Sequence, residues 1–383
     1  MNRKLNTFII LAIFLFGGLG LPAAGSFSRP AKYIRVAIIQ NAESLNLKVG
    51  GFYEITAPGG KNVPARGKNL MTTVTSYKNG ILMGDSNFNA GSVLISAGNA
   101  DMIIINGRTF RGDVKFIKNK SGKLTAVNYV ELEDYIRGIL YHEVSHYWPM
   151  EALKAQAIVC RTYAVYQMQE NKLRDFDVTS DIYSQVYGGK TSERYRTTSA
   201  VFATAGMMLT FQDKVFPAYF HSTCGGHTED AFLLWKTNIM PLKGVPCNFC
   251  EGSPHFNWHY VLTREEVRDK LVKGGYNINS IEDITIMARD GSGRVTDLKI
   301  KTAKNESKIP AKDFRNIIGP NIIRSTNFSV NLVHDDVVFE GLGWGHGVGL
   351  CQWGAYFMAK RGFSAMQILE YYYPEANLET IGF

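Results

Sequence analysis

The chain has 383 residues, which is long enough for a large hydrophobic core in two domains or in one elaborated domain. Hydrophobic residues make up 45% of the sequence and charged residues 20%, a composition that excludes a disordered protein. The net charge is +8, which suits an acidic polymer as partner. Because the sequence has no dense run of Arg and Lys and no nucleic-acid-binding motif, we expect no nucleic-acid partner.

The N-terminus has the pattern of an export signal. Arg3 and Lys4 precede an apolar run over 8–21, and small residues follow it. The run is shorter than the roughly 20 apolar residues that a membrane-spanning helix needs. We therefore predict a signal peptide over 1–25, with an uncleaved anchor as the alternative. The rest is expected to be exported and to lie in the cell envelope, in the periplasm or on the outer face of the cytoplasmic membrane. A basic protein in that place suits an acidic cell-wall glycan.

The first third of the chain, 32–129, has the pattern of β-strands. Short runs rich in β-branched residues, separated by Gly and Asn, predict strands. The predicted strands are 33–40, 92–96, 102–106 and 112–117. From residue 130 the pattern changes to helix. Pro149 stands where a first-turn proline belongs, and apolar residues recur at helical spacing from Met150 to Met168, which predicts a long helix with one apolar face.

The C-terminal half mixes both kinds of element. Thr263 is a plausible cap for a helix that extends to Leu271, because its side chain can accept from the first-turn amides. The remaining predictions are strands over 283–288 and 294–301, separated by a Gly-Ser-Gly turn, and helices over 311–318 and 364–373. Strands and helices are segregated, so the predicted class is α+β. We expect one domain over 32–383, with a β-rich part at 32–129 and a helix-containing part at 130–383 that carries a further strand-rich insertion.

Glu143 is the candidate catalytic residue. It stands between an apolar helical segment and an aromatic turn that contains Tyr147 and Trp148. Apolar and aromatic neighbours raise the pKa of a carboxyl, which allows it to act as a general acid near neutrality. Trp148 is also a candidate for stacking on a sugar. The alternative is that Glu143 is a surface or helix-capping acid.

Three motifs resemble the stage II sporulation protein D family. The first, G-x4-E-x4-W-P-x-E-A-L-K-A-Q-A, covers 138–157 and contains Glu143. The second, D-x3-Q-V-Y-G, covers 181–188, and the third, G-x-G-H-G-x-G-x2-Q-x-G-A, covers 343–355. The similarity is spread from about residue 34 to the C-terminus. The family includes lytic transglycosylases of peptidoglycan and the amidase-enhancer proteins related to them.

The resemblance implies a reaction at Glu143 that cleaves peptidoglycan glycan strands without water. The C6 hydroxyl of the muramic acid residue attacks its own anomeric carbon, so one carboxyl can act first as acid and then as base. A non-enzymatic, peptidoglycan-binding enhancer of an N-acetylmuramoyl-L-alanine amidase is the alternative, and a cell-wall amidase would then be the partner. A hydrolase would need a second carboxylate, for which Asp181 is the candidate, although a helix cap is its other interpretation.

The same resemblance implies which residues contact the glycan. By their positions in the motifs they are Gln185, Tyr187, His346 and Gln352. A hydrogen-bonded packing role is the alternative for His346 and Gln352. Some relatives carry Cys directly before the Gln of the second motif, where a metal is associated with the site. Tyr183 and Ser184 occupy these positions here, so zinc in the catalytic groove is not expected.

Five cysteines are present, and four residues have the spacing of a zinc site. Cys-x2-His followed by Cys-x2-Cys can surround tetrahedral zinc. The predicted ligands of this structural zinc are Cys224, His227, Cys247 and Cys250. His221 is a competing fourth ligand, and a disulfide is the rival interpretation, because an oxidising envelope favours it. Cys160 and Cys351 are expected to be buried small hydrophobic residues.

Overall fold

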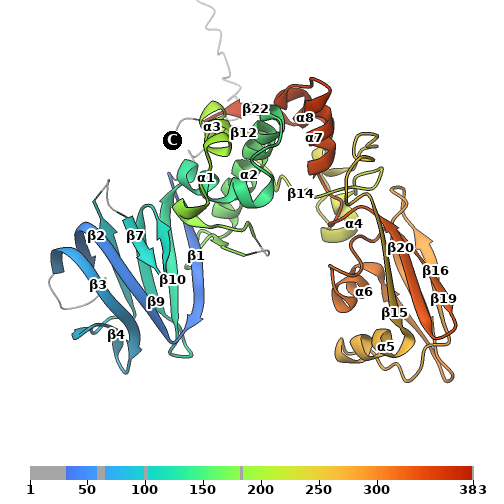
Figure 1. Cartoon of the computed structure of the whole chain (residues 1–383), viewed down its shortest axis with the longest axis horizontal. Coiled ribbons are helices and arrows are strands. Elements are labelled where there is room, and N and C mark those ends of the chain that lie inside the picture. The colour runs from blue at the N-terminus through green and yellow to red at the C-terminus, as the bar shows by residue number, and fades with distance from the viewer. Residues whose placement is uncertain (1–31, 58–64, 99–101, 182–183, 382–383) are drawn as a thin grey trace, which may run out of the picture.

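The protein has three parts that follow one another along an arch: an N-terminal sheet, a group of helices at the top, and a strand-rich region at 257–342 (Figure 1). The computed structural model describes residues 32–57, 65–98, 102–181 and 184–381. The predicted signal segment, 1–25, lies outside these ranges. Within them, none of the helices is both long enough and apolar enough to cross a membrane. The α+β class predicted from the sequence is confirmed.

The N-terminal sheet contains eleven described strands, nearly all antiparallel. They are β1 (Tyr33–Ala42), β2 (Ser44–Thr56), β3 (Ala65–Tyr77), β4 (Gly80–Met83), β5 (Ser86–Phe88), β6 (Ser92–Ala97), β7 (Met102–Ile105), β8 (Arg108–Phe110), β9 (Asp113–Lys118), β10 (Leu124–Glu131) and β11 (Val178–Thr179). The order is β11-β1-β10-β9-β6-β2-β3-β4-β5, with β7 pairing β2 and β8. The predicted strands correspond to β1, β6, β7 and β9. The sequence analysis missed the two longest strands, β2 and β3, because their outer positions are polar, as in a sheet with one solvated face.

The helical part is built around one helix. Its elements are α1 (Leu132–Glu143), α2 (Met150–Glu170), η1 (Gly189–Ser192), α3 (Tyr195–Ala203), β12 (Met207–Phe211), β13 (Lys214–Val215), β14 (Phe220–His221), α4 (Ala231–Trp235), η2 (Met240–Leu242), β21 (Leu350–Cys351), α7 (Gln352–Lys360), α8 (Ala365–Tyr372) and β22 (Asn377–Thr380). The long helix was predicted with one apolar face, and this was wrong. Leu153 and Ala157 of α2 belong to a core shared with the N-terminal sheet, whereas Ile158 and Val159 belong to a second core shared with α7 and α8. A helix buried on most of its circumference is apolar all round.

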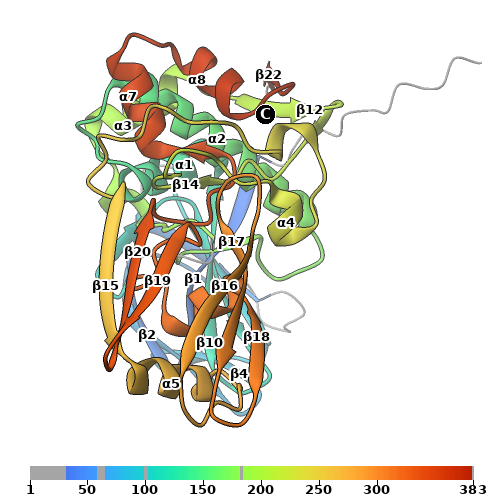
Figure 2. The ribbon, with the colours of Figure 1, turned by 90° about the vertical axis from the view of Figure 1, so that its right-hand side faces the viewer.

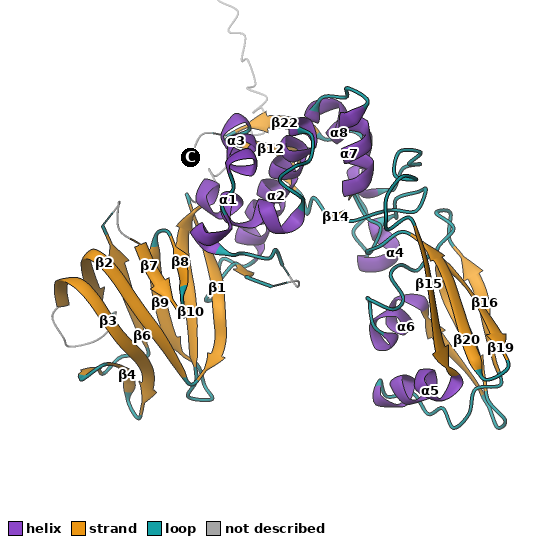
Figure 3. Ribbon diagram, in the orientation of Figure 1, coloured by secondary structure: helices purple, strands orange, loops and turns teal. Residues whose placement is uncertain are grey.

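The strand-rich region consists of two three-stranded antiparallel sheets and two helices. Its elements are β15 (Asn257–Thr263), α5 (Arg264–Lys273), β16 (Asp283–Arg289), β17 (Val295–Lys301), β18 (Glu306–Pro310), α6 (Ala311–Ile318), β19 (Phe328–Val333) and β20 (Asp336–Leu342). Figure 2 shows the sheets β15-β20-β19 and β16-β17-β18 side by side. Helices α5 and α6 cover one face of them (Figure 3), and Leu271 and Phe314 fill the core between. The predicted cap at Thr263 is confirmed, since Thr263 and Glu266 form a reciprocal capping box.

One buried ion pair joins α1 to α2. Arg161 is fully buried, and its Nε and Nη2 donate to the two carboxylate oxygens of Glu133 at 2.8 and 2.7 Å. Its Nη1 donates to the carbonyl of Met207 in β12, and Glu133 also accepts from the amide of Gly206. This two-pronged geometry satisfies both charges inside the protein and fixes the positions of α1 and β12 against α2.

We predict that Glu133→Gln lowers the free energy of unfolding by about 3–5 kcal/mol, because a buried guanidinium then lacks its counter-charge. The matched control is Glu265→Gln, which removes an exposed carboxylate that contacts Arg268. That variant should change the stability by less than about 1 kcal/mol. Urea unfolding measures both, and a loss below about 1 kcal/mol for Glu133→Gln would contradict the structural role of the pair.

Candidate active site

Glu143, the last residue of α1, lines a cavity of about 520 Å³ at the top of the arch. Segments distant in sequence meet there: the end of α1, the middle of α2, residues 184–186, β14, α4, and the glycine-rich segment with the start of α7. The lining is mostly aromatic and polar. It consists of Glu143, Tyr163, Ser184, Val186, Tyr219, Phe220, His221, Ser222, Trp235, Trp344, Gly345, His346 and Gln352. An aromatic cavity with few polar groups is the usual form of a small-ligand site.

Gln352 holds the end of α1 in place. The last carbonyls of a helix have no partner within the helix. Here the side-chain amide of Gln352 donates to the backbone oxygen of Glu143 at 3.2 Å, and it also lies 3.4 Å from the side-chain oxygen of Gln156 on α2. The first residue of α7 is therefore connected to both α1 and α2. Gln352 lines the cavity, as its position in the third motif implied, and it has a packing role as well.

Burial raises the pKa of Glu143 from 4.5 to about 7. The backbone amide of Val186 donates to the carboxyl and offsets part of this shift. In the part of the chain that the structure describes, Glu143 is the one carboxyl among the cavity residues. A carboxyl that is half protonated near neutrality can give up a proton and take it back within one reaction cycle.

The aromatic wall near Glu143 is not the one expected from its sequence neighbours. Tyr147 is 80% exposed, and Trp148 packs against Trp353 and Tyr356, with ring centroids 5.1 Å away in both cases. Neither residue lines the cavity. The chain leaves α1 in an extended conformation at Val144, which turns the following residues away from the carboxyl. The expectation that Trp148 faces the substrate was therefore wrong for this cavity.

Gln185 and Tyr187 are also outside the cavity. Each is only 1% exposed. Gln185 accepts from the hydroxyl of Tyr135, and the Tyr187 hydroxyl donates to the side-chain oxygen of Asn128 at 2.9 Å. In an extended segment successive side chains point to opposite sides. Ser184 and Val186 therefore line the cavity, whereas the two residues that alternate with them point into the core. Their expected contact with glycan was wrong.

The Tyr187 ring packs directly on the backbone of α1. A Cβ atom at Gly138 would lie 2.4 and 2.9 Å from two ring carbons of Tyr187. Real contacts are longer than this, so only glycine fits there. Gly138 is the glycine that opens the first motif. The spacing of the motif thus reflects close packing between α1 and the loop that places Val186 against Glu143.

We predict that Tyr187→Ala lowers the free energy of unfolding by about 3–5 kcal/mol, because it empties a buried aromatic site. The specific activity of the fraction that stays folded should be near that of the wild type. The control is Tyr195→Ala. Tyr195 is 87% exposed, so this variant should lower the free energy of unfolding by less than about 0.5 kcal/mol. Stable Tyr187→Ala protein with selective loss of glycan binding would restore the substrate-contact interpretation.

His346 lies in the cavity wall as a neutral imidazole. Its Nδ1 accepts from the amide of Val348 at 3.0 Å, and burial lowers its pKa to about 3. Its ring stands edge-on to Trp235, 5.1 Å between centroids. His346 therefore lines the cavity and is held by hydrogen bonds at the same time, and its contact with glycan stays a prediction. The lowered pKa keeps the imidazole uncharged near neutral pH.

The sequence analysis missed the residues that make up most of the cavity wall. Tyr219 and Trp235 stack at 4.4 Å between centroids and form one side with His346. Tyr163 comes from the middle of α2, and Trp344 from the glycine-rich segment. They come from separate elements, so no spacing along the chain marks them as a set. The one available signal was the density of aromatic residues within the third motif and around 219–221.

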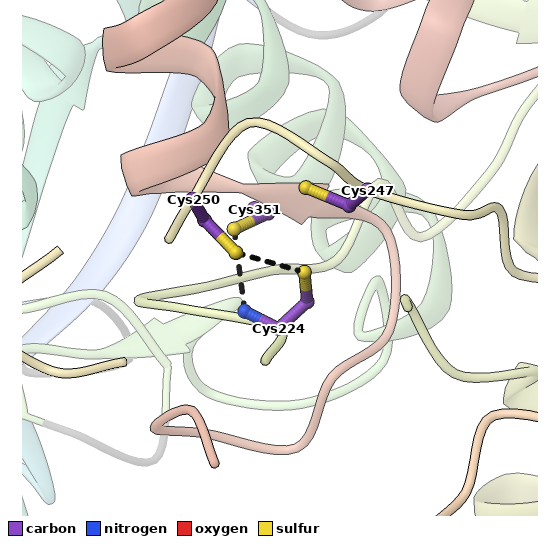
Figure 4. A group of neighbouring side chains, drawn as sticks. All are labelled: Cys224, Cys247, Cys250 and Cys351. Atoms are coloured by element: carbon purple, nitrogen blue, oxygen red, sulfur yellow. Dashed lines mark hydrogen bonds between the residues drawn. The ribbon is translucent and has the colours of Figure 1, made fainter. Parts of the chain in front are cut away.

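Four cysteines gather behind the cavity wall (Figure 4). The sulfur atoms of Cys224, Cys247, Cys250 and Cys351 all lie within 4.8 Å of one another, and all four residues are buried. We call this set the thiol cluster. Three of its members were predicted as metal ligands. The fourth member of the cluster is Cys351, in place of His227, which was the predicted fourth ligand. Cys160 is buried on α2, as expected.

The backbone explains why His227 is not in the cluster. Gly225 and Gly226 both have positive φ, and the chain then pairs His227 with Pro246 in an isolated β-bridge. The His227 ring hydrogen bonds to the carbonyl of Thr228 at 2.6 Å and points away from the sulfurs. His221, the competing candidate, lines the cavity and donates to the carbonyl of Val348 instead.

Comparison with known proteins places this sequence among characterised families. The family model described as Stage II sporulation protein matches residues 120–211, and one for a domain of unknown function (DUF8618) matches 247–349. Stage II sporulation protein D of Bacillus subtilis is 31% identical over 264 residues, covering 65% of this chain and 74% of that protein. The chain belongs to the stage II sporulation protein D family.

Two further relatives extend the comparison. An uncharacterized protein of Brachyspira hyodysenteriae is 35% identical over 274 residues, covering 71% of this chain and 73% of its own length. The amidase enhancer of Bacillus subtilis is 25% identical over 388 residues, covering 88% of this chain and 51% of that protein. The stage II sporulation protein match at 120–211 contains α1, α2 and Glu143, whereas the thiol cluster lies outside it.

The raised pKa of Glu143 predicts a pH-dependent effect on stability. Its pKa is 4.5 in the unfolded chain and about 7 in the folded protein, so the folded state holds the proton more tightly. Ionisation of Glu143 therefore lowers the stability as the pH rises from about 4.5 to 7. We predict that Glu143→Gln is more stable than the wild type at pH 8, by at most about 3 kcal/mol, with the difference vanishing near pH 4. Urea unfolding at pH 4 and pH 8 measures this difference in the free energy of unfolding. Glu170→Gln, at an exposed position, is the control. If Glu143→Gln and the wild type have the same stability at both pH values, the raised pKa of Glu143 is contradicted.

Proposed function

We propose that this protein is an exported peptidoglycan lytic transglycosylase in which Glu143 is the general acid and base. The observation that carries the proposal is a single carboxyl with a pKa of about 7 in an aromatic cavity. Membership of the stage II sporulation protein D family supports a role connected with the cell wall. The net charge of +8 suits a carboxylate-bearing glycan, and no nucleic-acid partner is proposed.

The proposed reaction has two proton transfers through the same carboxyl. Protonated Glu143 donates to the glycosidic oxygen as the bond to the anomeric carbon breaks. The resulting carboxylate then accepts the proton of the C6 hydroxyl while that oxygen bonds to the anomeric carbon. The products are a 1,6-anhydro-muramic end and a free hydroxyl on the leaving sugar, and the carboxyl is restored. Tyr219 and Trp235 offer flat apolar surfaces to sugar rings, and Gln352 holds the backbone carbonyl of Glu143.

The position of Asp181 favours this reaction over hydrolysis. Hydrolysis needs a second carboxylate across the scissile bond. Asp181 is exposed in a loop, where it accepts from the hydroxyl of Thr179 at 2.7 Å, and it does not line the cavity. Within the described ranges no other carboxyl faces Glu143 in the cavity.

The variant Glu143→Gln tests the chemistry, because it keeps the shape and removes the transferable proton. We predict glycan binding near that of the wild type and cleavage reduced by at least about 10²–10⁴-fold. Wild-type cleavage should also fall as the pH rises above 7, where the acid is lost. Mass spectrometry of purified glycan strands after digestion measures both, with anhydro-muramic ends as the signature. The matched control Asp181→Asn should cleave normally, and undiminished cleavage by Glu143→Gln would refute the assignment.

The amidase-enhancer relative supports a second candidate function. The match to the amidase enhancer of Bacillus subtilis spans 88% of this chain. In this alternative the cavity binds peptidoglycan without cleaving it, and the protein stimulates an N-acetylmuramoyl-L-alanine amidase. The digestion experiment separates the two: wild type that binds glycan, leaves no anhydro ends and accelerates an amidase would support the enhancer function.

For the cofactor we propose zinc in a structural role, held by the thiol cluster. Four buried thiols within 4.8 Å fit a closed tetrahedral site, in which no position remains for a water or a substrate. Zinc would therefore take no part in the proposed reaction, in which Glu143 transfers the protons.

A further inference from the structure

The thiol cluster joins the two ends of the strand-rich region. Cys247 and Cys250 come shortly before β15, and Cys351 comes shortly after β20. Cys224 lies on the loop that follows β14. Two of the three ligand segments also line the cavity, because His221 and Ser222 precede Cys224 and Gln352 follows Cys351. The cluster therefore lies at the one point where the strand-rich region, α7 and the cavity wall converge.

The distances between the sulfurs fit one metal ion. Four sulfurs at 2.3 Å from zinc in a tetrahedron are about 3.8 Å apart. In the structure the Cys224 and Cys250 sulfurs are 3.4 Å apart, and all four lie within 4.8 Å. Zinc is bound by thiolates, so binding releases the four thiol protons to solvent and leaves a centre with a net charge of −2.

The surroundings supply hydrogen-bond donors to the sulfurs. Cys351 is the N-cap of α7, and its sulfur accepts from the backbone amides of Gly354 and Cys224 at 3.4 and 3.3 Å. The hydroxyl of Tyr372 lies 3.1 Å from the sulfur of Cys247 and can donate to it. The positive end of the helix dipole at α7 favours a thiolate. Donors of this kind orient and stabilise metal-bound ligands.

A buried cation lies beside the cluster. Arg294, between β16 and β17, is 1% exposed. Its Nη2 donates to the carbonyl of Cys224 at 2.6 Å, and its Nη1 donates to that of His227 at 2.8 Å. The glycine-rich segment crosses directly over it: a Cβ at Gly347, where φ is +90°, would lie 2.6 Å from the guanidinium. Within the described ranges, Arg294 is the charged side chain that hydrogen bonds to the backbone of a cluster cysteine.

The nearby carboxyls balance only part of the positive charge of Arg294. Glu229 is buried beside Arg294 and accepts from Ser292, which in turn accepts from the Arg294 Nη1. Asp290 accepts from the backbone amide of Arg294. None of the carboxylates in the described residues forms a salt bridge with the guanidinium, and its Nε has no hydrogen-bond partner there. A buried guanidinium without a direct anion is costly, so a further negative centre is expected near it.

We propose that the thiol cluster holds one Zn²⁺ as a tetrathiolate and that Arg294 is the counter-cation of this centre. The ion then fixes both ends of the strand-rich region to the cavity wall, and the same region contributes the positive charge that stabilises the ion. Arg294 binds no substrate: its positive charge stabilises the negatively charged zinc centre, which in turn holds the cavity wall in position. The proposal goes beyond the reaction at Glu143 and does not depend on it, because zinc binding is measured without any glycan.

The experiment measures zinc in the purified full-length protein and its transfer to a chelator. The wild type is expected to carry about one zinc per chain. Arg294→Gln, which keeps an N–H donor but removes the charge, should bind zinc about 10–100-fold more weakly. Arg294→Lys, which keeps the charge, should stay within about tenfold of the wild type. The matched control is Arg315→Gln, since Arg315 has a buried Nε without a partner but touches no cluster residue; its zinc affinity should be unchanged.

Ligand variants test the fourth position. Cys351→Ser should lose zinc or bind it far more weakly, whereas His227→Ala should keep it. Circular dichroism of each variant shows whether it is folded, so that loss of metal is read only from folded protein. Wild type without zinc, with iron instead, or with disulfides that lower its thiol count after denaturation would overturn the metal assignment. Equal zinc affinity of Arg294→Gln and wild type would overturn the role of Arg294 alone.

Discussion

The burial of α2 on most of its circumference is the constraint on which the rest of the protein depends. One side of the helix belongs to the core of the N-terminal sheet and the other packs against α7 and α8, so two hydrophobic cores share it. The cavity exists because elements from distant parts of the chain converge on this helix. Glu143 lies at the end of α1, Tyr163 on α2 itself, and Gln352 at the start of α7. Arg161, the one buried cation of α2, forms an ion pair with Glu133 of α1. This pair fixes how α1 packs against α2.

The environment of Glu143 is costly for stability and useful for proton transfer. Burial raises its pKa to about 7; the amide of Val186 donates to the carboxyl and the side chain of Gln352 donates to the backbone carbonyl of Glu143. Glu229 shows that a raised pKa by itself does not identify a catalyst. Burial raises its pKa to about 7 as well, but it lies beside Arg294 and does not line the cavity. The difference lies in access to a ligand, which only the cavity provides.

The strand-rich region has its own core. Its core is formed by α5, α6 and the two small sheets, without residues from α2. The thiol cluster and Arg294 occupy its junction with the helical part. Several buried polar groups gather there, and in the low-dielectric interior their hydrogen bonds and charges interact strongly within a small volume.

The sequence by itself determined the features that depend on neighbours along the chain. It indicated the α+β class, the capping box at Thr263, Glu143 at the end of an apolar helix, and the two paired motifs that contain Cys224, Cys247 and Cys250. The tertiary structure decided which side chains share a space. It turned Gln185, Tyr187 and Trp148 away from the cavity, replaced His227 by Cys351, and brought Tyr219 and Trp235 into the wall. The physical reason is that the direction of a side chain in an extended or glycine-containing loop is set by the dihedral angles of each residue. These angles are fixed by packing against α2 and the glycine-rich segment, which are distant in the sequence.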